Sequence, residues 1–138
     1  MTPHFVRDLM CDRIYAVRPD DDLATVRDLM DDHAVRHVPV IDEEGSLVGL
    51  VSQRDLLRAA LIERADLPVI IERTLLERTH VSDVMTTYVE TVSPDTELRE
   101  AARQMLESKI GSLPVTDNDR LVGIVTEADF VRSYVDGG

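Results

Sequence analysis

The chain has 138 residues, of which 43% are apolar and 4% aromatic, and its formal net charge is −12. This composition is typical of a globular protein with an aliphatic core, and no apolar run approaches the roughly 18 residues that a membrane span needs. The acidic charge argues against nucleic acid and membranes as partners, and Cys11, the only cysteine, excludes an intrachain disulfide, so we expect a cytoplasmic protein.

The first elements expected along the chain are a short helix, a short strand, an amphipathic helix, two strands rich in β-branched residues and a last helix. Their ranges are Phe5–Met10, Ile14–Val17, a helix opened by Pro19-Asp20, His37–Ile41, Leu47–Val51 and a helix that starts at Ser52. The core face of the amphipathic helix carries Leu23, Val26, Leu29 and Met30. Next we expect a helix as far as about Ala65, a turn at Pro68 and a helix around Val69–Glu77.

The same elements then return in the same order. V-R-D-L-M at residues 6–10 matches V-S-D-V-M at residues 81–85, an offset of 75 positions that falls to 74 after a loop, where Gly49 matches Gly123. A register kept this long indicates an internal repeat. The expected ranges are Val81–Met85, Val89–Val92, a helix opened by Pro94-Asp95 with Leu98, Ala101, Ala102 and Met105 on its core face, Ser112–Thr116, Leu121–Val125 and a helix that starts at Thr126.

The chain therefore divides into two repeats, residues 1–60 and 77–138, joined by a helical linker at residues 61–76. Each repeat has the order β-α-β-β-α, which makes the fold class α/β (α+β). A small sheet that carries two helices on one side leaves its other face uncovered. We therefore expect the two repeats to cover each other and to pack with pseudo-two-fold symmetry.

A hydroxyl residue follows the last strand of each copy, and an aspartate comes three positions later. The pairs are Ser52 with Asp55 and Thr126 with Asp129. One interpretation is a capping box, in which each side chain binds a free N–H group at the start of the helix. The other is a ligand site, in which the helix start and the hydroxyl bind a phosphate and the carboxylate accepts hydrogen bonds from a ribose. A cap that also faces a ligand satisfies both interpretations.

Each copy resembles a cystathionine-β-synthase (CBS) domain. The resemblance rests on three motifs, with h for a hydrophobic residue: D-h-M before a strand and P-D, then V-P-V or L-P-V, then L-V-G-h-V-[ST]-x-x-D. It implies a tandem regulatory pair that binds an adenosine-containing ligand (AMP, ADP, ATP or S-adenosylmethionine) in clefts between the repeats. It also implies that Asp55 and Asp129 hold the ribose and that Ser52 and Thr126 approach the phosphate, giving two potential sites.

The resemblance implies a second group of contacts around the proline of each V-P-V or L-P-V motif. These residues are Arg36, His37 and Val38 in the first copy and Ser112 and Leu113 in the second. Arg36 and His37 suit a phosphate, so the two sites should be unequal, and a nucleotide is favoured over S-adenosylmethionine, which brings its own positive charge. A solvated cation at a helix end and a strand-edge histidine without a ligand remain open interpretations of these two residues.

The adenine leaves less trace in the sequence, because backbone contacts do not depend on the type of side chain. The resemblance implies that backbone groups near Ile14 and Val89 meet the adenine. It also implies that Val38 or Leu113 forms an apolar wall.

No motif for catalysis is found in the sequence. It has no phosphate-binding loop of the P-loop type, no dinucleotide fingerprint and no nucleophile elbow. The acidic runs at residues 20–22 and 31–32 lack the spacing of a calcium loop, which favours solvated charge near helix ends over a metal site. We therefore predict that the protein is not an enzyme and that it requires no cofactor and no metal.

Two hypotheses follow. In the first, the pair senses a nucleotide and passes the signal to an unknown regulated protein or to its own homodimer. Leu56, Leu57, Phe130 and Val131 are candidates for buried contacts in that homodimer. In the second, the pair is a dimerising scaffold that binds no nucleotide, and both Ser/Thr–Asp pairs act only as helix caps.

Overall fold

An antiparallel β-hairpin forms the sheet of each repeat. β1 (His37–Ile41) pairs with β2 (Leu47–Ser52), and β3 (Ser112–Asp117) pairs with β4 (Arg120–Thr126). The β-branched runs predicted all four strands. In the first hairpin, Asp42 Oδ1 accepts hydrogen bonds from two backbone N–H groups of the turn, each at 2.9 Å, so this acidic side chain closes the turn.

The chain forms two units, and each unit combines segments of both repeats. Tyr15–Val89 is one unit, here called the contiguous unit, whereas Met1–Ile14 and Glu90–Gly138 together make the two-segment unit. The structure is a computed structural model that describes residues 2–64 and 69–137, with the side chains of residues 60–72 left aside. The chain crosses between the units after Ile14 and again after Val89, which are equivalent positions of the repeat.

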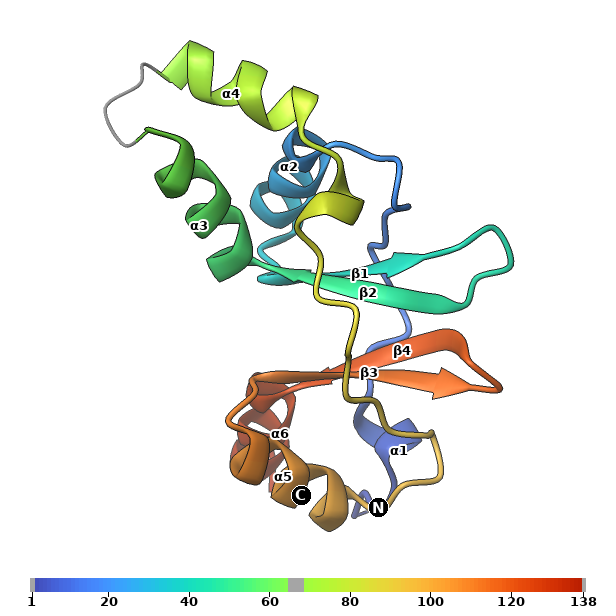
Figure 1. Ribbon diagram of the computed structural model, residues 1–138. Helices are drawn as coiled ribbons and strands as arrows, with labels where there is room; N and C mark the ends of the chain where they lie inside the picture. The colour runs from blue at the N-terminus through green and yellow to red at the C-terminus, as the bar shows by residue number, and fades with distance from the viewer. Residues whose placement is uncertain (1, 65–68, 138) are drawn as a thin grey trace. The chain divides into compact units, whose positions relative to one another are not determined.

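Three helices accompany the β1–β2 hairpin in the contiguous unit. Figure 1 shows α2 (Leu23–His33) and α3 (Gln53–Arg64) on the same side of the hairpin, and α4 (Val69–Arg78) packs against both of them. A 3₁₀ turn, η1 (Val81–Asp83), follows α4. The helices α3 and α4 confirm the two helices predicted before and after Pro68, and the expected turn at Pro68 lies outside the described residues.

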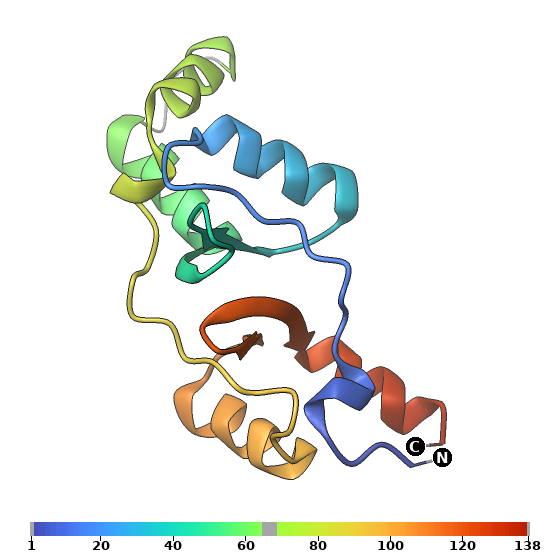
Figure 2. The same ribbon diagram turned by 90° about the vertical axis from the view of Figure 1, so that its right-hand side faces the viewer.

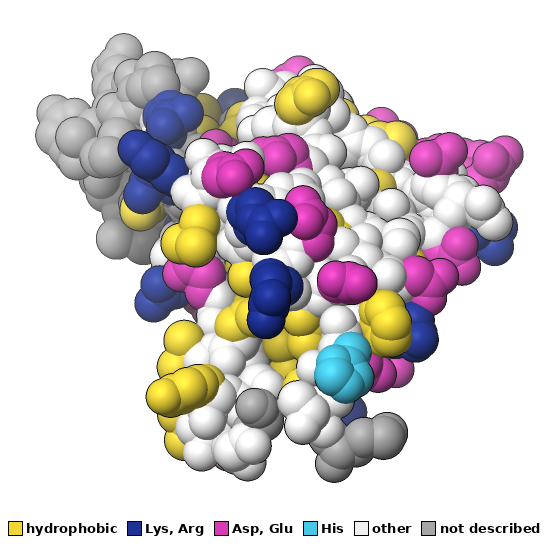
Figure 3. All heavy atoms as spheres, turned by 90° about the horizontal axis from the view of Figure 1, so that it is seen from below, with side chains coloured by type: hydrophobic (Ala, Val, Ile, Leu, Met, Phe, Trp, Pro, Cys, Tyr) yellow, Lys and Arg dark blue, Asp and Glu magenta, His cyan; other side chains and the backbone are white. Residues whose placement is uncertain are grey.

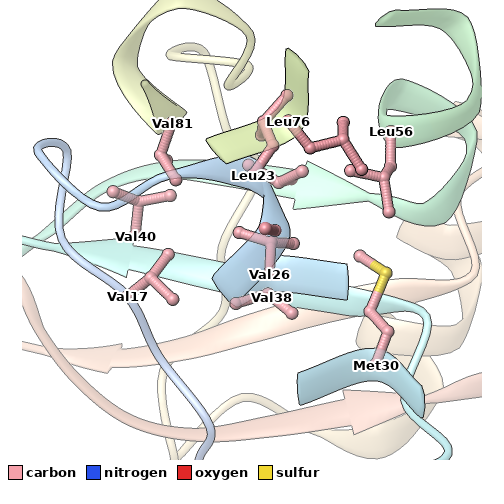
Figure 4. Close-up of a cluster of buried hydrophobic side chains, with 11 residues drawn as sticks. Val17, Leu23, Val26, Met30, Val38, Val40, Leu56, Leu76 and Val81 are labelled. Atoms are coloured by element: carbon pink, nitrogen blue, oxygen red, sulfur yellow. The ribbon is translucent and has the colours of Figure 1, made fainter. Parts of the chain in front are cut away.

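The core of the contiguous unit lies between these helices and the hairpin, where side chains from all of them point into one cluster (Figure 4). Its buried members are Val17, Leu23, Ala24, Val26, Met30, Val38, Val40, Val51, Leu56, Leu76 and Val81. The predicted core face of α2 is confirmed, with Leu29 partly buried against the cluster. Leu56, which was expected to be available for dimer contacts, is 7% exposed and belongs to this core instead, together with Leu76 of α4.

The two-segment unit is built on the β3–β4 hairpin. Its helices are α1 (Val6–Leu9), α5 (Leu98–Ser108) and α6 (Glu127–Val135), and α1 lies beside α6 (Figure 2). The buried cluster is smaller and consists of Val6, Val92, Ala101, Met105, Leu113, Val115 and Val125. None of the residues of α6 is buried. Within the described residues, this unit has no counterpart of α4.

The first segment of each repeat packs on the rest of the other repeat. We call residues 4–11 and 79–86 the lead-in segments. The Val6 N–H donates to the carbonyl of Thr96 at 2.8 Å, and the Val81 N–H donates to the carbonyl of Asp21 at 2.8 Å. The two bonds are equivalent under the offset of 75, so the lead-in segments are exchanged reciprocally between the repeats.

A methionine of each lead-in segment occupies the space beside a glycine of the opposite repeat. A Cβ atom placed on Gly123 would lie 2.7 Å from Met10 Sδ, and one placed on Gly49 would lie 2.5 Å from Met85 Sδ. Both methionines pack against the core of the unit that receives them. The glycine of the L-V-G motif therefore makes room for the methionine of D-h-M from the other repeat.

The strands predicted at Ile14–Val17 and Val89–Val92 are wrong. Only the last residue of each stretch reaches a sheet, through isolated parallel bridges from Val17 to Val40 and from Val92 to Val115. The preceding residues carry the chain from one unit to the other, so they do not follow a neighbouring strand.

The amphipathic helices begin later than predicted. α2 starts at Leu23 rather than near Pro19, because Asp22 is its N-cap and accepts the Thr25 N–H at 2.8 Å. α5 likewise starts at Leu98. The acidic run before α2 thus supplies a helix cap, in line with the interpretation as charge near a helix end.

Candidate functional site

Ser52 and Asp55 form a reciprocal hydrogen-bonded pair at the start of α3. The Ser52 N–H donates to Asp55 Oδ2 at 2.9 Å, and the Asp55 N–H donates to Ser52 Oγ at 3.1 Å. This arrangement is the capping box predicted from the sequence. The second oxygen, Asp55 Oδ1, and the proton of the Ser52 hydroxyl have no partner among the described residues. Both are therefore able to bind a ligand.

The second copy forms the same box with additional bonds. The Thr126 N–H donates to Asp129 Oδ2 at 2.8 Å, and the Asp129 N–H donates to Thr126 Oγ1 at 3.3 Å. The Thr126 hydroxyl also donates to Asp129 Oδ2 at 3.1 Å, and Arg132 Nη1 donates to Asp129 Oδ1 at 3.3 Å. Both oxygens of Asp129 therefore have partners, whereas only one oxygen of Asp55 has one.

Arg132 was not predicted as a site residue, although its spacing from Asp129 is visible in the sequence. Residues three positions apart on a helix are neighbours on its surface. Arg58 stands at the equivalent position after Asp55. Among the described residues, Arg58 forms no ion pair with Asp55, so the two copies differ in geometry although their sequences match here.

A backbone carbonyl occupies a further donor at each helix start. The Gln53 N–H donates to the carbonyl of Arg36 at 2.8 Å, and the Glu127 N–H donates to the carbonyl of Gly111 at 3.0 Å. A helix start offers only about four free N–H groups. The starts of α3 and α6 therefore keep fewer free N–H donors for a phosphate than the sequence suggested. Side chains must supply more of the contacts to a phosphate.

The residues before the V-P-V and L-P-V prolines lie opposite the caps in the sheet register. His37 is paired with Ser52, and Ser112 is paired with Thr126. Directly opposite residues of an antiparallel pair place their side chains on one face of the sheet. Ser112 is 4% exposed, and its hydroxyl has no hydrogen-bond partner among the described residues. A buried hydroxyl without a partner costs about 1–3 kcal/mol, which a polar group of a ligand would recover.

The remaining predicted contacts differ in exposure. Val38 and Leu113, expected as apolar walls, are fully buried in the cores of their units, so a ligand would reach only their backbone in this structure. Arg36 is exposed, and its guanidinium forms no ion pair with the described residues. Arg36 is therefore available to an anion.

Ile14 and Val89 are the last residues before the two crossings between the units, and both are half-buried. Ile14 belongs to the unit that contains Thr126, and Val89 belongs to the unit that contains Ser52. The structure thus groups each of these residues with the cap of the other repeat.

Two aspartates have lowered pKa values. Backbone N–H groups of Phe5 and His4 lower the pKa of Asp8. Arg73 lowers the pKa of Asp28, because its two terminal nitrogens donate to the two carboxylate oxygens at 3.2 and 3.1 Å. That ion pair ties α4 to α2.

Three further features bear on function in the part of the chain that the structure describes. No three side chains of His, Cys, Asp or Glu gather there as metal ligands. None of the helices there is both long enough and apolar enough to cross a membrane. Cys11 is exposed and carries a free thiol.

Residues 6–62 and 81–136 match the family model of the CBS domain. The chain belongs to the CBS-domain family. As a CBS-domain pair, it resembles solved structures over nearly its whole length. The protein AcuB of Vibrio cholerae is 37% identical with a TM-score of 0.81, and the match covers 96% of this chain and 90% of that one. CBSX2, solved in complex with AMP, is 33% identical with a TM-score of 0.81, and the match covers 97% and 98%.

Among its curated relatives, the CBS-domain pair also matches part of a larger enzyme. It is 31% identical to a homoserine O-acetyltransferase of Methanococcoides burtonii, a match that covers 96% of this chain. The chain spans 24% of the length of that enzyme. The acetyltransferase activity therefore stays with the larger protein.

Proposed function

We propose that this CBS-domain pair is a regulatory module that binds an adenine nucleotide (AMP, ADP or ATP) at the starts of α3 and α6. Asp55 carries the proposal, because the Ser52 N–H fixes one carboxylate oxygen at 2.9 Å and leaves the other open. A carboxylate held by its own helix accepts the two hydroxyls of a ribose without first being ordered. The complex of the relative CBSX2 with AMP supports this choice of ligand.

Arg36 supports a phosphorylated ligand. Its carbonyl accepts the Gln53 N–H at 2.8 Å, which fixes its main chain beside the start of α3. In a chain with a net charge of −12, an anion needs a local cation, and this exposed guanidinium forms no ion pair with the described residues. S-adenosylmethionine, with its positive sulfonium, fits such a site less well.

Binding would regulate by shifting a conformational equilibrium. Only the difference in nucleotide affinity between two conformations is transmitted, so the signal is a coupling free energy and not a reaction. We place the module in the cytoplasm, with an unknown regulated protein or a second copy as the receiver. On this proposal it needs no cofactor for its own activity.

Isothermal titration calorimetry with AMP, ADP, ATP and S-adenosylmethionine tests the proposal. We expect saturable binding of at least one nucleotide and a loss of tenfold or more in affinity at the altered site in Asp55→Asn and Asp129→Asn. Asparagine keeps a side-chain oxygen for the cap, so thermal unfolding should change little and serves as the control. A folded protein that binds none of the four ligands would contradict the proposal.

A scaffold that binds no nucleotide is the second candidate, and the complete capping boxes favour it. Each Ser/Thr–Asp pair already has partners within its own helix start. On this alternative, Ser52→Ala or Thr126→Ala lowers the free energy of unfolding by about 1 kcal/mol and has no effect on ligands.

We propose a homodimer in which a second copy covers apolar side chains of the last helices. Leu57 is 57% exposed and Val131 is 63% exposed, and Tyr134 and Val135 of α6 are exposed as well. On the face seen in Figure 3, hydrophobic side chains are exposed among acidic and basic ones. Light scattering should give the mass of a dimer at micromolar concentration, and Val131→Asp should reduce it. A monomeric mass for the unaltered chain would contradict the homodimer.

A further inference from the structure

The carboxylate of Asp129 is engaged from both sides. Its Oδ2 accepts the N–H and the hydroxyl of Thr126, at 2.8 and 3.1 Å. Its Oδ1 accepts Arg132 Nη1 at 3.3 Å. The Asp129 side chain is 15% exposed, whereas the Arg132 side chain is 68% exposed. The arginine therefore reaches the carboxylate from the solvent side, where a ligand would also approach it.

The equivalent carboxylate in the contiguous unit is open. Asp55 Oδ2 accepts only the Ser52 N–H, at 2.9 Å, and Oδ1 has no partner among the described residues. Arg58, the counterpart of Arg132, leaves it unpaired. The Ser52 hydroxyl accepts the Asp55 N–H and keeps its own proton, whereas the Thr126 hydroxyl donates its proton to Asp129.

A ribose that binds a carboxylate through two vicinal hydroxyls needs acceptor positions on its oxygens. Each carboxylate oxygen offers about two such positions. At Asp129, three of about four are occupied within the chain, so a ribose must displace or share the bond from Arg132. At Asp55 it displaces nothing.

We propose that Arg132 competes with the ribose of the ligand for Asp129, so that the site at the start of α6 binds an adenine nucleotide more weakly than the site at the start of α3 and fills second. The inference rests on the proposed function. An exposed ion pair between neighbours on a helix is weak, so the competition reduces the affinity by roughly two- to fivefold. The buried hydroxyl of Ser112, which has no partner among the described residues, still favours binding there, so the site is weakened and not lost.

The test isolates the α6 site in the full-length protein by using Asp55→Asn as the background. Calorimetry with AMP is then compared between this background and the same protein with Arg132→Gln. The matched control is Arg58→Gln, which removes the same charge from the equivalent helix position. We expect Arg132→Gln to tighten AMP binding roughly two- to fivefold and Arg58→Gln to leave it unchanged.

A second ligand separates the competition from a general effect of charge. The advantage of Arg132→Gln should disappear with 2′,3′-dideoxy-AMP, which lacks the two hydroxyls. Weaker binding of AMP by Arg132→Gln would overturn the inference and assign Arg132 to the phosphate, and unchanged binding or loss of all binding in Asp55→Asn would overturn it too. If the unaltered protein bound none of AMP, ADP, ATP and S-adenosylmethionine, the proposed function would instead be overturned, and the inference with it.

Discussion

The contiguous unit and the two-segment unit grow from the same repeat but are completed in different ways. In the contiguous unit, α4 adds Leu76 to the core and binds Asp28 of α2 through Arg73. The two-segment unit has no such helix among the described residues and is closed by the N-terminal lead-in segment, whose Val6 is fully buried. Similar repeats therefore give one unit completed by contacts within a single segment of chain and one completed by contacts between the N-terminal and C-terminal segments. Bringing those distant segments together costs more conformational entropy.

Removal of residues 2–11 should produce the largest difference in stability between the two units. The two-segment unit then loses the buried Val6, the backbone bonds of Cys11 to Ile124 and the helix α1. We expect this unit to lose its protection against amide hydrogen exchange while the contiguous unit keeps its own.

Single substitutions in the two lead-in segments should have a smaller effect on stability than the deletion. Val6→Ala and its counterpart Val81→Ala should each lower the free energy of unfolding by about 2 kcal/mol in urea titrations. Full protection of both units after the deletion would show that the lead-in segment is dispensable.

The glycine sites should give an intermediate effect. In Gly49→Ala, the new Cβ would meet Met85 Sδ at 2.5 Å and the carbonyl oxygen of Thr86 at 3.1 Å. We expect a loss of about 1–3 kcal/mol, measured by urea unfolding, because both neighbours must move. Met85→Ala should recover part of this loss, since it removes the closest atom but leaves the carbonyl.

The exchanged pairing makes this cycle a test of connectivity. In Gly123→Ala the atom to remove is Met10 Sδ, at 2.7 Å. Met10→Ala should therefore rescue Gly123→Ala and should not rescue Gly49→Ala. Rescue in the opposite combination would mean that each lead-in segment packs on its own repeat.

The smallest effect is expected on the stability of the contiguous unit at acid pH. Arg73 lowers the pKa of Asp28 in the folded contiguous unit below its unfolded value of about 3.9. A lowered folded pKa means that the pair contributes stability above about pH 4 and that this contribution is lost as the pH falls through the folded pKa. Asp28→Asn should therefore flatten the acid dependence of unfolding for this unit only. Identical acid profiles of the two proteins would contradict a contribution from the pair.

Local signals predicted much of the fold. The four strands, the core face of α2, the core face of α5 except for Ala102, which lies outside the buried cluster, and both capping boxes follow from patterns within a few residues of each other. The exchange of the lead-in segments could not be predicted, because in a repeat the contact of Met10 with Gly123 is indistinguishable by sequence from a contact with Gly49. The strand expected at Ile14–Val17 was wrong because no local pattern in the sequence marks a crossing between units.

The candidate site was predictable in its residues but not in their states. The spacing of Ser52 and Asp55 gave the cap, and the same spacing gave Thr126 and Asp129. The burial of Ser112 depends on packing, and the bond from Arg132 to Asp129 depends on a side-chain conformation that Arg58 does not share. Equivalent motifs therefore give equivalent backbone conformations, whereas the hydrogen bonds of their side chains depend on the neighbouring residues.

The exchange of the lead-in segments bears on why two repeats share one chain. A lone repeat would have to take its lead-in segment from another molecule, and its folding would then depend on protein concentration. The two crossings, after Ile14 and after Val89, keep each lead-in segment on the same chain as the repeat that receives it. Each segment therefore meets its receiving repeat at a high effective concentration. Each unit therefore stays complete on dilution, and we expect the protein to fold even at low cellular abundance.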